Sequence, residues 1–157
     1  MVTVKEVQNI VKTYQPDKVH IGVIGSHSAL ALGMSAKAFG AKTLIVVEKG
    51  RDVLYTREHH HLYDHVILVD KFKDILNADV QAEMLEYNTV WVPHRSFTVY
   101  VGAEEIESNF RIPMYGNRHM LGSEDRNAKR SQYYFLDKLA SGIPSILHCP
   151  NRLTGWF

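Results

Sequence analysis

The segment Gly25-Ser26-His27-Ser28 joins an apolar run, residues 19–24, to an alanine-rich stretch, residues 29–39, that has the composition of a helix. A strand that turns through glycine directly into a helix leaves the first backbone N–H groups of that helix unpaired and facing the turn. These donors lie at the positive end of the helix dipole, where an anion is stabilised. The sequence therefore predicts a strand, a turn and a helix that together hold a phosphate group.

Short β-rich runs recur along the chain between helical or turn-rich stretches, at residues 19–24, 43–47, 66–69 and 89–92. Nearly continuous apolar strands are typical of a parallel sheet whose two faces are both covered by helices. The pattern predicts an α/β fold, with strands and helices alternating as βαβαβαβ and with helices on both faces of a parallel sheet.

Helical patterns precede, separate and follow these runs. Ser123 is expected to cap a last helix that Gly142 closes. The first helical segment, residues 1–16, has an amphipathic pattern, unlike the continuous apolar core of a signal peptide. No apolar run reaches the length of a membrane span. The remaining expected helices are residues 29–39, which Gly40 ends, and residues 79–87.

Composition limits the partners. A chain of 157 residues that is 45% apolar can form one domain with a sizeable core. Its net charge of +1 gives no general attraction to nucleic acid, so a small partner is expected. The single cysteine, Cys149, can form no internal disulfide and no zinc site of paired cysteines, which fits a reducing cytoplasm.

Four segments, in this order and at this spacing, resemble one family over roughly residues 1–144. The family is the archaeal-type 5-formaminoimidazole-4-carboxamide ribotide synthetase, a formate-dependent ATP-grasp ligase of purine biosynthesis, and the resemblance is to its N-terminal domain. The segments are Gly25-Ser26-His27-Ser28-Ala29-Leu30, Lys49-Gly50-Arg51-Asp52, Val92-Pro93-His94 through Ser96-Phe97, and Pro113-Met114-Tyr115-Gly116-Asn117-Arg118.

The resemblance implies a Rossmann-like (pre-ATP-grasp) domain at residues 1–144 that binds 5-aminoimidazole-4-carboxamide ribotide, and the start of a missing or truncated ATP-grasp domain at residues 145–157. In the family, formate is activated with ATP and Mg²⁺ or Mn²⁺, and the formyl group passes to the 5-amino group of the ribotide. Catalysis by the chain alone is not expected, and neither is tight binding of a cofactor. A homo-oligomer is also implied.

The resemblance places substrate-binding residues, and no catalytic residue, in the chain. His27 and Ser96 correspond to ribotide contacts of the family, while Arg51 offers a planar fork to a phosphate. Each has a plainer interpretation: a histidine that stabilises a turn, a polar turn residue, and a surface arginine paired with Asp52. The full set of candidates is Ser26, His27, Ser28, Arg51, Ser96, Asn117 and Arg118.

Ser26 and Ser28 can also serve as helix caps, and the two roles can coexist. Gly116 permits an unusual backbone angle that would bring Asn117 and Arg118 inward. Two residues depart from the family pattern: Arg95 stands where a glycine is usual, and Leu54 where a proline is common. The arginine would either fill part of the pocket or add a phosphate contact.

Two clusters invite a metal interpretation that we do not adopt. His59, His60 and His61, with His65 nearby, do not share one face in either a helix or a strand, so an exposed loop cluster is expected instead of a metal site. The acidic run Glu104-Glu105-Ile106-Glu107 is interpreted as a solvated helical face.

Two other functions are considered. A stand-alone module that binds or senses a phosphometabolite without turnover would satisfy the same physics, because fold alone selects no substrate. A dinucleotide-binding domain is disfavoured, because Ser28 and Leu30 occupy the positions at which the further glycines of the dinucleotide fingerprint would stand.

Overall fold

The computed structural model describes residues 1–125, 128 and 131–139. The chain divides into two compact units, Met1–Leu121 and Gly122–Phe157. The sheet and the candidate site belong to the first unit, and the helix α6 (Gln132–Leu139) belongs to the second. The predicted boundary between residues 144 and 145 falls outside the described residues and stays a prediction.

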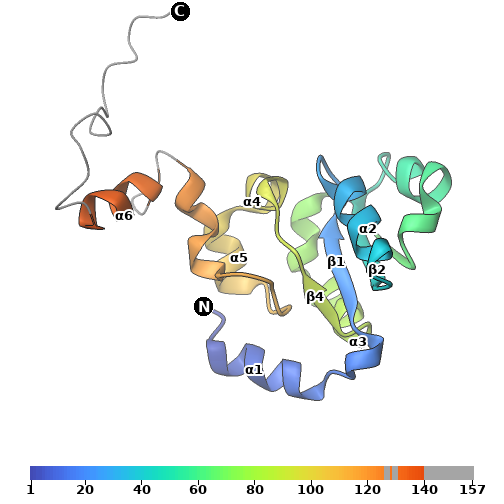
Figure 1. Cartoon of the computed structure of the whole chain (residues 1–157), viewed down its shortest axis with the longest axis horizontal. Helices are drawn as coiled ribbons and strands as arrows, with labels where there is room; N and C mark the ends of the chain where they lie inside the picture. Colours follow the sequence, from blue (N-terminus) through green and yellow to red (C-terminus); the bar gives the residue numbers. More distant parts are fainter. Residues whose placement is uncertain (126–127, 129–130, 140–157) are drawn as a thin grey trace, which may run out of the picture. The chain divides into compact units, whose positions relative to one another are not determined.

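Four parallel strands form a single sheet in the order β3-β2-β1-β4, as Figure 1 shows in part. Each strand lies within one residue of its predicted range at either end. The apolar runs pair with one another because their main-chain groups must be satisfied once their side chains are buried. The strands are β1 (His20–Ile24), β2 (Lys42–Glu48), β3 (His65–Val69) and β4 (Thr89–Trp91).

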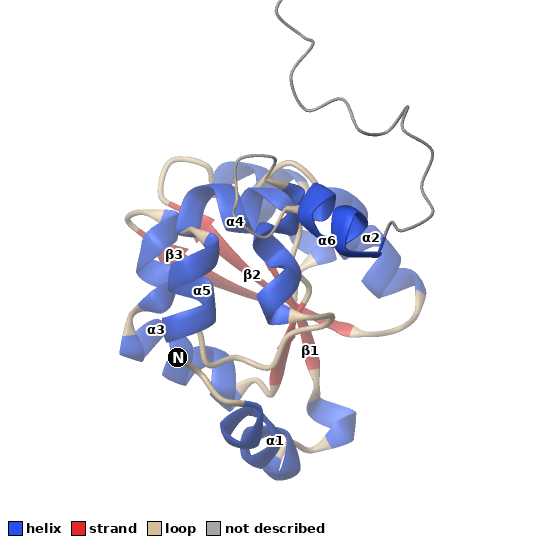
Figure 2. Ribbon diagram, turned by 90° about the vertical axis from the view of Figure 1, so that its left-hand side faces the viewer, coloured by secondary structure: helices blue, strands red, loops and turns tan. Residues whose placement is uncertain are grey.

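Helices cover both faces of this sheet, which confirms the predicted α/β architecture (Figure 2). On one face, α2 (Ala29–Ala38) packs against β1 and β2. On the other face lie α3 (Ala78–Glu86), α4 (Arg95–Val101), α5 (Ala103–Asn109) and the 3₁₀ segment η4 (Phe72–Leu76).

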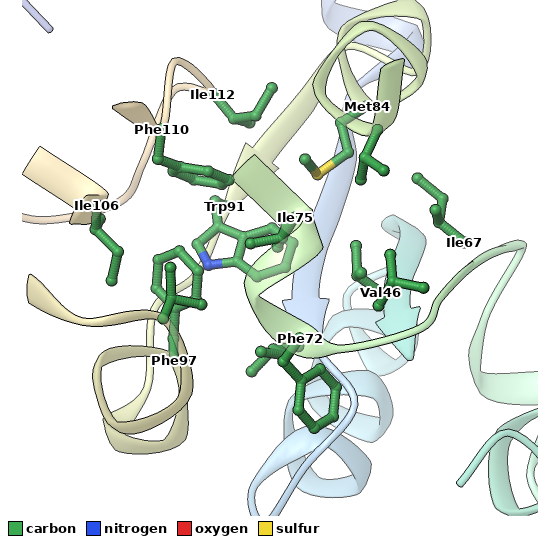
Figure 3. Close-up of a cluster of buried hydrophobic side chains, with 14 of the residues drawn as sticks. Val46, Ile67, Phe72, Ile75, Met84, Trp91, Phe97, Ile106, Phe110 and Ile112 are labelled. Atoms are coloured by element: carbon green, nitrogen blue, oxygen red, sulfur yellow. The ribbon is translucent and has the colours of Figure 1, made fainter. Parts of the chain in front are cut away.

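The larger hydrophobic core fills the space between the sheet and the α3, α4 and α5 face (Figure 3). Trp91, at the end of β4, is fully buried and lies at its centre. Its ring centroid is 5.1 Å from that of Phe97 and 5.5 Å from that of Phe110. These aromatic contacts fix α4 and the segment after α5 against the sheet.

The first helix, α1 (Val4–Thr13), begins at a capping box. The Thr3 hydroxyl accepts from the Glu6 backbone N–H, and the Glu6 carboxylate accepts from the Thr3 backbone N–H. α1 has no buried residue. Its attachment to the sheet runs through Tyr14, whose hydroxyl donates to the Thr89 carbonyl at 3.0 Å. α2 ends before Gly40, which has a φ of 72° and terminates the helix as predicted.

The alternation βαβαβαβ is wrong at the second crossover. β2 and β3 are joined by a π-helical turn, η2 (Leu54–Glu58), and a 3₁₀ turn, η3 (His60–Leu62), in place of an α-helix. The intervening stretch Arg57 to His61 has no apolar side chains at helical spacing, so a regular helix there would have nothing to bury. Tyr55, Leu62 and Tyr63 anchor the segment in the core.

Ser123 does not cap the last helix. It lies inside the 3₁₀ segment η5 (Arg118–Glu124), and α6 begins later, at Gln132. The segment closes tight turns instead, since the Asp125 N–H donates to the Gly122 carbonyl at 3.1 Å. Gly142, expected to close the helix, lies outside the described residues.

Candidate functional site

The strand order places the switch point of the sheet between β1 and β4. The chain leaves β1 for α2 on one face and leaves β4 for α4 on the other. In open α/β sheets, ligands bind outside the carboxyl ends of the strands near such a point. The turn after β1 and the segment from His94 to Ser96 after β4 both lie at this edge.

The turn after β1 presents open backbone donors. The Ser26 N–H donates to the Ile24 carbonyl at 2.8 Å, and the Ala29 N–H donates to the Ser26 carbonyl at 2.7 Å. Among the described residues, the backbone N–H groups of His27 and Ser28 have no hydrogen-bond acceptor. The turn therefore has the free amides that the sequence predicted for an anion site.

Glycine is required at the start of this turn. A Cβ built on Gly25 would lie 2.9 Å from Cγ2 of Val47 and 3.2 Å from both the Val46 carbonyl oxygen and the Tyr55 ring. A side chain at this position would thus push the end of β1 away from β2. Gly25 allows the turn to approach the β2 loop closely.

The two serines of the turn do not behave as helix caps. Ser28 is the N-cap residue of α2, yet its hydroxyl makes no capping bond, so that prediction is wrong. Its Oγ lies 3.4 Å from Nδ1 of His27 instead. The Ser26 hydroxyl lies near Tyr100 of α4 and lowers the pKa of its phenol. Both hydroxyls thus lie at the surface of the turn, and neither satisfies the end of the helix.

A cavity of about 530 Å³ lies between the turn after β1 and the loop after β2. Ser26, His27 and Arg51 supply its polar side chains, and His27 is exposed to solvent. The loop residue Leu54, one of the two departures from the family pattern, is part of its apolar wall. The lining residues are Gly25, Ser26, His27, Leu30, Gly50, Arg51, Val53, Leu54 and Tyr55.

Arg51 contacts aromatic rings instead of a carboxylate. Its guanidinium carbon lies 5.5 Å from the Phe72 ring centroid and 5.6 Å from that of Tyr100. The Asp52 carboxylate accepts from the Gly50 N–H at 2.9 Å, and no described carboxylate lies within ion-pair distance of Arg51. The interpretation of Arg51 as the ion-pair partner of Asp52 is therefore wrong.

Tyr100 was not a predicted site residue. Its hydroxyl lies 3.4 Å from Nη1 of Arg51, and the pKa of Tyr100 is lowered by this hydrogen bond, by the Ser26 hydroxyl and by the charge of Arg51. The sequence holds one signal for it: Ser96 and Tyr100 are four residues apart and share a face if residues 95–101 are helical. That helix was not predicted.

Ser96 and His94 occupy the other side of the switch point. His94 is the N-cap residue of α4, and its Nε2 lies 3.2 Å from the Ile24 carbonyl oxygen. Burial lowers the pKa of His94, and the nearby His27 lowers it further. Ser96 is half-buried in the first turn of α4 and does not line the cavity. Arg95 beside it is exposed and does not fill the cavity either.

Asn117 and Arg118 are not brought to the cavity. The Arg118 guanidinium is buried and donates to the main-chain carbonyls of Ile106, Phe110 and Ile112. The Asn117 side chain accepts from the His119 N–H at 3.0 Å. Arg118 thus holds the segment after α5 in place, whereas the exposed Asn117 makes a local turn contact, and the role of both in ligand binding stays a prediction.

The rings of the histidine triplet lie side by side, with that of His61 5.9 Å from His60 and 6.1 Å from His59 between centroids. In the described part of the chain, no three His, Cys, Asp or Glu side chains are arranged to hold a metal ion. His65 pairs with Glu83 at 2.7 Å and stacks on Tyr87, away from the other histidines of its cluster. Glu107 lies in α5, 3.3 Å from His119.

None of the helices in the described residues is long and apolar enough to cross a membrane.

The chain is similar to proteins of a single family. A family model described as "Protein of unknown function (DUF1246)" matches residues 21–147. The chain is 40% identical over 131 residues to a protein of Methanobrevibacter smithii and 42% identical over 126 residues to one of Methanothermobacter thermautotrophicus. Both relatives are named 5-formaminoimidazole-4-carboxamide-1-(beta)-D-ribofuranosyl 5'-monophosphate synthetase.

These matches cover 83% and 80% of the chain but only 36% and 34% of the relatives, so the chain spans about a third of their length. A solved structure, described as an IMP biosynthesis protein PurP from Thermococcus kodakaraensis, is similar with a TM-score of 0.59 and 30% identity. That match covers 74% of this chain and 35% of the other.

Proposed function

The chain belongs to the DUF1246 family, and from this premise we propose that it is the ribotide-binding N-terminal part of an ATP- and formate-dependent ligase of purine biosynthesis. Its ligand is 5-aminoimidazole-4-carboxamide ribotide. The product in the relatives' name carries a formamino group at position 5, so the substrate carries an amino group there. A cytoplasmic location is part of the proposal.

The observation that carries the proposal is the convergence of Ser26, His27 and Arg51 on one cavity beside two open backbone amides. An arginine fork, a hydroxyl and helix N-terminal amides are the donors that a phosphomonoester requires. Ser96 lies across the switch point, on the face of α4 that also carries Tyr100. His27 and Ser96 are the proposed contacts to the rest of the ribotide.

Binding of the ribotide in this domain contributes to the reaction by holding its 5-amino group in position for attack on the activated formate. Formate activated as formyl phosphate is attacked by the 5-amino group of the ribotide, the C–N bond forms, phosphate leaves with the electron pair of the broken C–O bond, and the amine gives up one proton, which the leaving phosphate can take. Holding the amino group in place makes this attack effectively intramolecular, which can supply about 7 to 11 kcal/mol of the barrier in favourable cases.

ATP and Mg²⁺ or Mn²⁺, which the resemblance implies, are assigned to other parts of a complete enzyme. A metal ion would need several carboxylates or histidines in one place, and the described residues offer no such group of three. The acidic run of α5 does not provide one, because Glu105 bonds to Asn109 and Glu107 lies beside His119.

Calorimetric titration of the chain with 5-aminoimidazole-4-carboxamide ribotide tests the proposal. We expect saturable binding that weakens about tenfold or more in His27→Ala, because a hydrogen bond to the ligand is lost. His61→Ala, which removes an exposed histidine of η3, is the matched control and should bind as the parent does.

Absence of ribotide binding would overturn the proposal. Binding of a different phosphometabolite in its place would favour the stand-alone module. NAD should produce no thermal shift, because the turn lacks the further glycines of the dinucleotide fingerprint.

A further inference from the structure

Four side chains gather at the carboxyl edge of the sheet, and each follows a different strand. Ser26 follows β1, Arg51 follows β2, Phe72 follows β3, and Tyr100 lies in α4 after β4. We call these four residues the Arg51 cluster. The Phe72 and Tyr100 ring centroids are 4.8 Å apart, and the Arg51 guanidinium lies over both rings.

The cluster orients Arg51 before any ligand is present. Two aromatic faces support the guanidinium plane, and the Tyr100 hydroxyl lies 3.4 Å from Nη1. The Ser26 hydroxyl lies near the same phenol and lowers its pKa. A guanidinium held in this way loses less side-chain freedom when it forms a bidentate contact.

The positive charge of Arg51 is not neutralised by a bonded carboxylate. The charge of Glu48 contributes to raising the pKa of Arg51, but Glu48 forms no ion pair with it and accepts from the Phe72 N–H at 3.2 Å, while Asp52 accepts from the Gly50 N–H. A fixed, unpaired cation therefore stands at a cavity that also has open amides from His27 and Ser28. This combination favours a small dianion with several acceptor oxygens.

We propose that the Arg51 cluster is the subsite for the phosphate group of the ligand, a phosphomonoester, and that Tyr100 is a binding residue within it. The inference rests on the proposed function and deepens it. Arg51 donates two N–H groups to the phosphate, while the Tyr100 hydroxyl turns from accepting the Arg51 bond to donating to a phosphate oxygen. The phosphate thus lies between the β1 and β2 loops, and the rest of the ligand extends toward His27.

Calorimetric titration with three ligands tests the assignment: the ribotide, its riboside, which lacks the phosphate, and ribose 5-phosphate. Tyr100→Phe keeps the ring on Phe72 and removes only the hydroxyl. We expect it to weaken the ribotide and ribose 5-phosphate about 10- to 150-fold, the range for one hydrogen bond to a charged group, and to leave the riboside unchanged. Arg51→Lys should follow the same pattern with a loss of about tenfold or more, because the bidentate fork is gone.

Tyr14→Phe is the matched control. It also deletes a phenol that makes a hydrogen bond, but its partner is the Thr89 carbonyl at the first residue of β4, the opposite edge of the sheet. It should bind all three ligands as the parent does. Thermal melts of every variant show whether a lost affinity comes from unfolding.

The outcomes separate this inference from the proposed function. If Tyr100→Phe binds ribotide as tightly as the parent, or weakens riboside equally, the phosphate assignment is overturned while ribotide binding stands. If ribose 5-phosphate binds and depends on Tyr100 but ribotide does not bind, the subsite stands and the proposed function fails. Lack of binding of all three ligands overturns both.

Discussion

The imidazole of His94 is hydrogen-bonded across the switch point, with Nε2 3.2 Å from the carbonyl oxygen of Ile24. Ile24 is the last residue of β1, and His94 is the residue from which α4 starts. Since the carbonyl can only accept, Nε2 carries the proton. One hydrogen bond therefore sets where Ser96 lies relative to the turn that holds His27.

Because burial lowers the pKa of His94, the unfolded chain binds more protons than the folded chain near the ordinary histidine pKa. The free energy of unfolding should therefore fall as the pH is lowered from 7.5 to 5. In His94→Gln, which retains a donor but cannot titrate, this fall should be smaller. Thermal melts across the pH range measure it, with His61→Gln at an exposed position as the control. An unchanged pH slope in His94→Gln would contradict the assignment.

Gly25→Ala should destabilise the fold by about 1 to 3 kcal/mol through overpacking. The new methyl would lie 2.9 Å from Val47 Cγ2 and 3.2 Å from the Val46 carbonyl oxygen, and the backbone contact cannot rotate away. Urea unfolding measures the loss. A variant as stable as the parent would show that the β1 and β2 ends do not approach as closely as described.

Ser28→Ala should change the free energy of unfolding by less than about 0.5 kcal/mol, because the hydroxyl makes no capping bond. A side chain that caps a helix typically contributes about 1 kcal/mol, so chemical denaturation distinguishes the two cases. A loss of that size would restore the capping role. Ribotide affinity, measured on the same variant, reports separately whether the hydroxyl contacts the ligand.

Arg118→Lys should cost several times more stability than Asn117→Ala, on the order of 2 to 4 kcal/mol. A lysine cannot donate to the carbonyls of Ile106, Phe110 and Ile112 together, so buried acceptors are left unpaired. Denaturant melts give the stability, and titration of the folded variant gives the affinity. A variant of native stability with lost ribotide binding would identify Arg118 as a ligand contact instead.

The strands and the position of the site followed from local pattern. Buried parallel strands are apolar over their whole length, and the residues after their carboxyl ends share one edge of the sheet, which is why His27 and Arg51 could be placed together. Tyr100 could not be placed at this edge from the sequence, because it reaches the edge only through α4. The run from Thr98 to Val101 has no clear helical pattern by itself.

Arg118 shows a different limit. A sequence shows that an arginine is present but not which carbonyls surround it, and the three acceptors of Arg118 come from residues 6 to 12 positions earlier. The segment returns beside β4, where Met114 pairs with Trp91, and this return carries the arginine into the interior. Its charge suggested a ligand, whereas its partners are main-chain atoms.

The Arg51 cluster draws one side chain from behind each strand, so its assembly depends on every pairing in the sheet. Slipping any strand by one residue would send its side chains to the opposite face and dismantle the cluster. An anion bound by Arg51 and Tyr100, which the other members of the cluster hold in place, therefore adds its binding energy to the correctly registered sheet alone. The ligand therefore stabilises the native strand register selectively, and binding of the ligand reports that all four strands are correctly paired.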